Sequence, residues 1–325
     1  MLFTLNTLKK KASKIFPWLI AVGIFYSLFR KYPLPQLIEA ARYAHVSIFI
    51  LYATAYFFFM GLMDCVGMVW LFGRFGFSTS LKKILPVRLA SYLIMVLNYP
   101  AAQGMLAYFF TRTKKIPFLQ AMGMIVFLTL MDLYWTISFA FVGSFFSDFS
   151  IKGIDLNQIV RMIWMGTTMG LVCVMAFRAL PPGLKGVAWV RKRHLFQVFH
   201  QAHPFDYLKV LLLRLPMHLA INTSFYFIAL SFGTFIPFWK VIARLPLVIL
   251  VGTIPVTPGG LGTVQVATVE FFKSDVSEPI LLSMSLAFVF MNYFLKAVTG
   301  SIFFRTALQY REPECTLHPV TEEKI

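Results

Sequence analysis

The sequence predicts an all-α polytopic membrane protein, with about six transmembrane helices and two re-entrant helical hairpins in an inverted repeat. Three observations predict this fold class: the composition, the lengths of the apolar runs, and an order of segments that recurs in both halves. Of the 325 residues, 58% are hydrophobic and 13% are charged, and the mean hydropathy is +0.74. Soluble domains are usually about one-quarter charged. We therefore expect most of the chain to lie in a bilayer.

A helix needs about 20 apolar residues to cross the hydrocarbon core. Runs that are candidates for spans are residues 16–29, 44–73, 116–147, 159–178, 206–236 and 278–304. The first run is short and lies between the basic LKKKASK and Arg30-Lys31. We therefore expect it to remain in the protein as a short span whose flanking cations reach the head groups.

Two further apolar runs, residues 88–111 and 241–272, are broken by NYPAAQG (98–104) and PVTPGGLG (255–262). Irregular backbone at membrane depth is tolerated only where it is buried in protein or lines a cavity. Both runs therefore predict re-entrant hairpins whose breaks face inward and whose tips meet near the midplane. The alternative is that both are packing kinks in long helices.

The hairpin tips supply the candidate substrate path. Pro258 lacks an N–H and the neighbouring glycines permit positive φ, while Thr263 is placed to cap the returning half-helix. The positive end of that half-helix would favour a phosphate or carboxylate. The candidate path residues are Asn98, Pro100, Gln103, Gly104, Pro258, Gly259, Gly260, Gly262, Thr263 and Gln265.

The order of segments in residues 1–150 recurs in residues 158–305. Each half contains a span, an amphipathic piece (33–44 and about 184–203), a long span, a broken run and a final span. Because each half has three spans, the second half would enter the membrane upside down, as in many transporters. We expect one transmembrane domain over residues 1–305 and a polar cytoplasmic tail over residues 306–325.

The formal net charge of +17 comes from 30 Lys and Arg against 13 Asp and Glu. These cations flank apolar runs, which favours membrane lipids, anionic ones above all, over nucleic acid as partners. With both termini in the cytoplasm, most of the cations, Arg88 and Arg214 among them, fall on the cytoplasmic side. This predicts a multi-pass protein of the cell (inner) membrane.

Four ionisable residues, Asp64, Asp132, Glu270 and Lys296, lie within apolar runs. Such residues are costly in a bilayer and usually face a partner or a cavity. Asp132 could pair with Lys296 or with an arginine near a hairpin base, and its role could be functional or structural. The charged site candidates are Arg88, Arg112, Asp132, Arg244 and Lys296, whereas we expect His218 to be a packing residue.

No catalytic motif is present, since the chain lacks G-x-S-x-G, a Walker loop, H-E-x-x-H and D-x-D. Cys65, Cys173 and Cys315 are far apart, which indicates neither a disulfide nor a thiolate metal site. We expect no catalytic residue, metal or cofactor. Gly166 and Gly170, a G-x-x-x-G pair, would pack helices within the chain or in a homo-oligomer.

Two segments, PVTPGGLGTVQVA and RLASYLIMVLNYPAAQGMLAYFFTR, together with the following span that carries Asp132, resemble the lysylphosphatidylglycerol synthase transmembrane, or flippase-like, family. That resemblance covers nearly the whole chain and implies a membrane protein that handles lipids or lipid-linked head groups. The family includes the membrane half of the bacterial multiple peptide resistance factor, which moves aminoacylated phosphatidylglycerol across the membrane.

The resemblance does not imply aminoacyl transferase activity, because that activity belongs to a separate soluble domain for which this sequence has no room. The chain also departs from the family in having Gln265 where an acidic residue is frequent, and Gly104-Met105 where Gly-Glu is frequent. Any mechanism that needs those carboxylates is in doubt for this chain.

Three hypotheses about function follow. The leading one is a lipid translocase, a flippase or scramblase, for an anionic or lipid-linked head group, with passive or ion-coupled movement because no ATP-binding motif is present. The second is a non-transporting accessory subunit of a lipid or envelope biosynthesis enzyme. The third, an intramembrane enzyme acting on a polyprenyl phosphate, would need Asp64, Asp132 and Glu270 to converge.

Overall fold

The computed structural model describes residues 18–42, 44–146, 150–151, 154–181, 185–254 and 256–309. Within these ranges the regular structure is helical, apart from a short antiparallel pair, β1 (Ser150–Ile151) and β2 (Ile154–Asp155). A helix over residues 18–31 comes first. The labelled helices that follow are α2 (Leu34–Ala41), α3 (Val46–Arg74), α4 (Leu81–Leu97), α5 (Tyr99–Lys114), α6 (Phe118–Gly143), α7 (Leu156–Phe177), α8 (Lys185–Arg191), η1 (His194–Phe196), α9 (Gln197–Gln201), α10 (Pro204–Ser231), α11 (Phe238–Thr253), η2 (Pro258–Gly260), α12 (Thr263–Phe272) and α13 (Glu278–Gln309).

Five of the described helices are long and apolar enough to cross a bilayer: α3, α6, α7, α10 and α13. They confirm five of the six expected spans. The sixth, the short run near the N-terminus, forms a helix over residues 18–31, which is about 21 Å long at about 1.5 Å per residue. Residues 1–17 lie outside the described ones, so its crossing of the bilayer stays a prediction. Helix α13 continues to Gln309, past the expected boundary at residue 305, and the tail beyond it lies outside the described residues.

Both broken runs form helical hairpins. Helices α4 and α5 meet at Asn98, whose φ of −157° and ψ of 110° are extended, and the two helices pack against each other. Helices α11 and α12 also pack together, and η2 lies between them. Gly259, Gly260 and Gly262 have φ of 59°, 73° and 85°, a region that residues with a Cβ rarely adopt. The predicted chain reversal therefore depends on these glycines.

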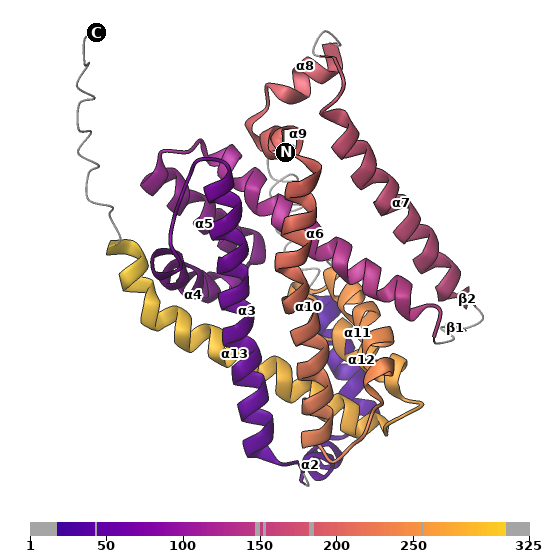
Figure 1. The fold of residues 1–325 in the computed structure, drawn as a ribbon. Helices are drawn as coiled ribbons and strands as arrows, with labels where there is room; N and C mark the ends of the chain where they lie inside the picture. The colour runs from indigo at the N-terminus through magenta and orange to yellow at the C-terminus, as the bar shows by residue number, and fades with distance from the viewer. Residues whose placement is uncertain are drawn as a thin grey trace, which may run out of the picture.

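The packing between the two halves follows a two-fold pattern. The long helix of the first half, α3, packs against the long helix of the second half, α10. Helix α4 of the first hairpin packs on α13, and α11 of the second packs on α6. Figure 1 shows α2 at one end of the bundle and α8 and α9 at the opposite end, as expected when the second half is inverted. The structure thus agrees with the inverted repeat.

A glycine permits close approach at each of these two equivalent crossings. A Cβ added at Gly143 of α6 would lie 2.5 Å from the backbone of Ala243 in α11, and one at Gly300 of α13 would lie 2.6 Å from the backbone nitrogen of Leu93 in α4. Because real Cβ atoms essentially never approach so closely, each hairpin is held against a helix of the other half by backbone contact.

Helix α7 lies at the edge of the bundle, where it packs on α6 (Figure 1). Only Val160 is buried within it, and a Cβ at Gly166 or Gly170 would meet nothing within 4 Å. The expectation that these glycines pack helices within the chain is therefore wrong. The same open face leaves the homo-oligomer alternative as a prediction.

Candidate functional site

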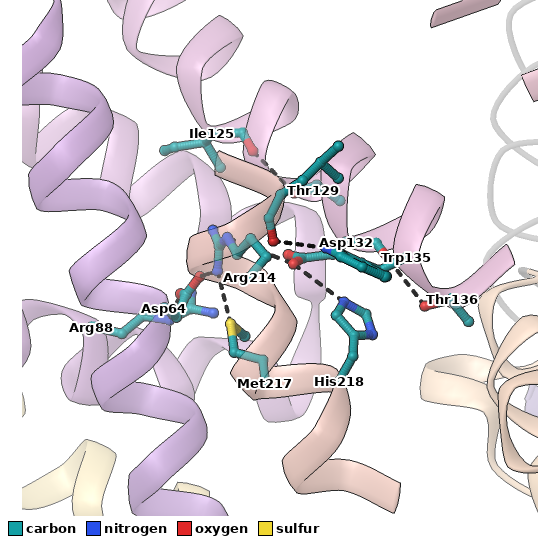
Figure 2. A network of polar contacts seen from close by, with 11 residues as sticks. Asp64, Arg88, Ile125, Thr129, Asp132, Trp135, Thr136, Arg214, Met217 and His218 are labelled. Atoms are coloured by element: carbon teal, nitrogen blue, oxygen red, sulfur yellow. Dashed lines mark hydrogen bonds and ion pairs between the residues drawn. The ribbon is translucent and has the colours of Figure 1, made fainter. Parts of the chain in front are cut away.

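A charged cluster is buried between the two halves, and Arg214 of α10 is at its centre (Figure 2). The Arg214 side chain is 1% exposed, and its Nη1 donates to Asp64 Oδ1 of α3 at 2.5 Å. The Nε of Arg88, from α4, lies 2.7 Å from the other oxygen of Asp64. One carboxylate is therefore shared by two guanidinium groups from different helices.

Asp132 of α6 lies on the other side of Arg214 (Figure 2). Its Oδ1 is 3.6 Å from Arg214 Nε and 3.6 Å from His218 Nε2. These distances exceed a normal hydrogen bond, and Asp132 Oδ1 is buried without a hydrogen-bond partner. With 30% of its side chain exposed, Asp132 is the most accessible charged group of the cluster.

Small residues on α3 make room for this cluster. A Cβ at Gly67, three residues after Asp64, would lie 3.1 Å from Arg214 Nε, and a Cβ at Gly61 would lie 3.1 Å from the Tyr92 hydroxyl. Because residues three apart share a helix face, Asp64 and Gly67 together shape the place where the Arg214 side chain lies. Arg214 in turn ties the second half of the chain to both carboxylates of the first half.

The cluster borders a cavity of about 200 Å³. Five helices, α3, α4, α5, α6 and α10, contribute to its wall. The lining residues are Met60, Asp64, Met68, Arg88, Tyr92, Tyr99, Gln103, Ile125, Leu128, Thr129, Asp132, Arg214 and Met217. The cavity therefore combines apolar walls with converging charged groups, the usual make-up of a small-molecule binding site.

Of the predicted path residues in the first hairpin, Gln103 lines this cavity. Gln103 is 7% exposed, lines the cavity and has an Oε1 without a hydrogen-bond partner. Asn98 caps α5, since its Oδ1 accepts from the Ala101 N–H at 2.8 Å. Pro100 is exposed in the first turn of α5, where its missing N–H costs nothing. Gly104 meets no neighbour within 4 Å of an added Cβ.

The second hairpin contributes no residue to the lining of this cavity, so the expectation that both breaks line one path stays a prediction. Its tip packs instead on apolar and aromatic side chains: a Cβ at Gly262 would lie 2.9 Å from Ile24, and a Cβ at Gly259 would lie 2.5 Å from the Tyr293 hydroxyl. Pro258 begins η2. Both hairpins touch α13, the second at Tyr293 and the first at Gly300.

The cap of α12 also differs from the prediction. Gly262 is the N-cap, and its N–H donates to Oε1 of the fully buried Gln265 at 2.7 Å. The Thr263 hydroxyl donates to the Gly260 carbonyl at 3.0 Å and does not cap the helix. Gln265 Nε2 is buried without a hydrogen-bond partner.

The expected partners of Asp132 are wrong, because Arg214 and His218 occupy its surroundings and Arg88 pairs with Asp64. His218 does pack between the rings of Trp135 and Phe139, as predicted, but it also contacts Asp132. Arg88 and Arg214 are buried in the interior, and their expected position on the cytoplasmic side stays a prediction.

The remaining charged candidates lie outside the cluster. Arg112 is exposed in the last turn of α5. Arg244 pairs with Asp275, which also binds Lys240 and Ser274. Burial acts to raise the pKa of Asp275, but the hydrogen bonds from Lys240 and Ser274 and the charge of Arg244 together hold that pKa below its ordinary value. This network closes the base of the second hairpin.

Two observations concern the chemistry of the site. Glu270 lies outside the cluster, on a half-exposed ion pair with Lys273 at 2.7 Å, so the three carboxylates of the enzymatic hypothesis do not converge. Among the described residues, no group of three or more His, Cys, Asp and Glu side chains could hold a metal ion. The groups present can bind charged ligands: they are two guanidinium groups, a partly exposed carboxylate and an imidazole.

Fold and site together define a polytopic helical membrane protein that has two broken-helix hairpins and a charged cavity between its halves. The chain belongs to the family described as the lysylphosphatidylglycerol synthase TM region, which it matches over residues 15–300. The family suggested by the two broken segments is thus confirmed. Comparison with curated proteins gave no match, and neither did comparison with solved structures.

Proposed function

We propose that the protein is a lipid translocase of flippase or scramblase type, in which the cavity beside Arg214 admits an anionic or lipid-linked head group. The observation that carries this proposal is the enclosed pair of guanidinium groups, Arg88 and Arg214, beside an open volume among membrane-spanning helices. Charged groups at that depth are costly, and proteins retain them mainly along substrate and ion pathways. Membership of a membrane family named for a lipid synthase supports lipid partners.

The size of the cavity favours a head group over a whole lipid. Pockets that bury a drug-sized ligand have about 300–1,000 Å³, whereas this cavity has about 200 Å³. In the proposed mechanism a phosphodiester fits there while the acyl chains remain in the bilayer. Guanidinium groups suit such a guest, because their planar N–H groups match two phosphate oxygens at once.

The ion pairs provide a way for binding to change the relation between the halves. Arg214 of the second half is held by Asp64 and Asp132 of the first half. A phosphate that binds Arg214 competes with these carboxylates, so it weakens the tie between the halves while the head group is present. The motion of the two repeats about the site is then either passive or ion-coupled.

The direct test is translocation of head-group-labelled phosphatidylglycerol in proteoliposomes, compared with protein-free vesicles. The proposal predicts movement that depends on the protein and requires no nucleotide. If several anionic and polyprenyl lipids fail to move while a known scramblase works alongside, the translocase is refuted. Co-purification of a lipid-synthesis enzyme would then favour the accessory-subunit hypothesis.

A further inference from the structure

Lys296, in the middle of α13, has no counter-ion among the residues that the structure describes. No described carboxylate lies within 4 Å of its Nζ, which instead lies 5.5 Å from the ring centroid of Tyr293. The side chain is only partly exposed. An ammonium group on a membrane-spanning helix is costly unless it reaches a partner or water. The ammonium group is not enclosed by the protein and is therefore open to an anion from outside the described chain.

That position lies between the contacts that α13 makes with the two hairpins. Tyr293, one turn before Lys296, contacts the second hairpin at Gly259, and Gly300, one turn after it, contacts α4 of the first hairpin. Residues three or four apart share a helix face. Lys296 is thus on the face of α13 that meets both hairpins. Its neighbour Leu295 packs against Leu89 and Tyr92 of α4, the helix that carries Arg88.

The charge balance of the interior is also incomplete. The described groups in this region are the cations Arg88, Arg214 and Lys296 and the carboxylates Asp64 and Asp132. These five groups carry three positive and two negative charges, so one positive charge has no counter-charge among them. Because charges interact strongly where the effective dielectric constant is low, one additional anion would be stabilised there.

We propose that Lys296, together with Arg88, binds the phosphate group of the substrate as a second station between the two hairpins, next to the cavity at Arg214. This inference rests on the proposed function and adds a substrate class to it, a singly charged phosphodiester. An ammonium group binds phosphate as a point charge without a fixed orientation. The Lys296 ammonium group therefore suits a site that a head group occupies transiently during translocation.

The first experiment measures the binding of phosphatidylglycerol to the purified full chain by native mass spectrometry. Replacing Lys296 by Met should weaken binding about tenfold or more, as expected for loss of a charged hydrogen-bond partner, and Lys296→Arg should retain binding. Lys273→Met is the matched control, because Lys273 is an exposed lysine of an ion pair. Diacylglycerol, which has no phosphate, should bind wild type and Lys296→Met alike. Unchanged phosphatidylglycerol binding by a folded Lys296→Met protein overturns the proposal.

A second measurement requires no variant. Acylation of the Lys296 amine by a membrane-permeant reagent is followed in wild type, with Lys273 as the internal reference. Slower acylation with phosphatidylglycerol alone assigns the site to a lipid head group, and slower acylation with inorganic phosphate as well assigns it to a phosphate of either source. Protection by neither overturns the proposal.

The two proposals fail in different ways. If wild type binds phosphatidylglycerol through Lys296 and moves none, the translocase is refuted and the phosphate site stands. If wild type and Lys296→Met bind and translocate phosphatidylglycerol equally, the translocase stands and the site at Lys296 is refuted.

Discussion

Replacing Asp64 by Asn tests whether this one carboxylate holds the interior together. The change keeps the shape of the side chain but removes the charge that lies 2.7 Å from Arg88 and 2.5 Å from Arg214. Arg214 keeps Asp132 at 3.6 Å, so the net loss is close to one buried ion pair. Breaking such a pair costs about 3–5 kcal/mol. At about 2 °C per kcal/mol, the Tm should fall by roughly 6–10 °C.

The assay is thermal unfolding in detergent, with Glu270→Gln as the control. Glu270 belongs to a half-exposed pair, whose loss costs about 0–1 kcal/mol. Adding Arg88→Gln to Asp64→Asn removes the stranded cation, so the double variant should be more stable than the sum of the single effects by about 1–3 kcal/mol. If Asp64→Asn unfolds at the control temperature, or if the two effects simply add, the account of a shared carboxylate is refuted.

Three further predictions concern the hairpins. Gly300→Ala should destabilise the protein by about 1–3 kcal/mol through overpacking against α4. The control Gly166→Ala, on the open face of α7, should not lower the Tm. Equal effects of the two substitutions would contradict the close helix crossing. Gln265→Leu should lower the stability by about 1–3 kcal/mol, because it leaves the buried Gly262 N–H without its acceptor. Gln265→Glu keeps an acceptor oxygen at that position and should be more stable than Gln265→Leu. Equal Tm values for the two variants would contradict the cap. The lowered pKa of Asp275 means that its contribution to stability is present above about pH 4 and is lost as the pH falls through the lower, folded-state pKa. Asp275→Asn should therefore unfold at lower temperature than wild type at pH 7, and the gap should close on acidification; a gap that persists at low pH would rule out this role.

Much of the architecture is predictable from the sequence, because length and hydropathy fix the spans and because Pro and Gly fix the breaks. The two hairpins at 98–104 and 255–262 and the repeated order of elements follow from these local rules. The short first span marks the limit of these rules, because a short apolar run flanked by cations does not show how far its helix extends into the bilayer. The cap of α12 was missed since Gln265 reaches back to Gly262 from the next turn.

The site was less predictable, because its pairs join residues far apart in the chain. Asp64 and Arg214 are separated by 150 positions, and only packing of α3 on α10 brings them together. A sequence clue existed: Arg214 stands in the apolar stretch LLLRLPM, where a loop cation is not expected. A single cation in such a stretch shows that a partner is required but does not show which carboxylate provides it.

The most direct test of the account is to fill the cavity and to measure phosphatidylglycerol translocation in proteoliposomes. Thr129 lines the cavity, so Thr129→Trp places an indole in the space assigned to the head group. Met169→Trp, at an exposed position of α7, is the matched control. The account predicts that, with both variants folded, Thr129→Trp abolishes translocation and Met169→Trp leaves it at the wild-type rate. Wild-type translocation by Thr129→Trp would show that lipids cross by another route.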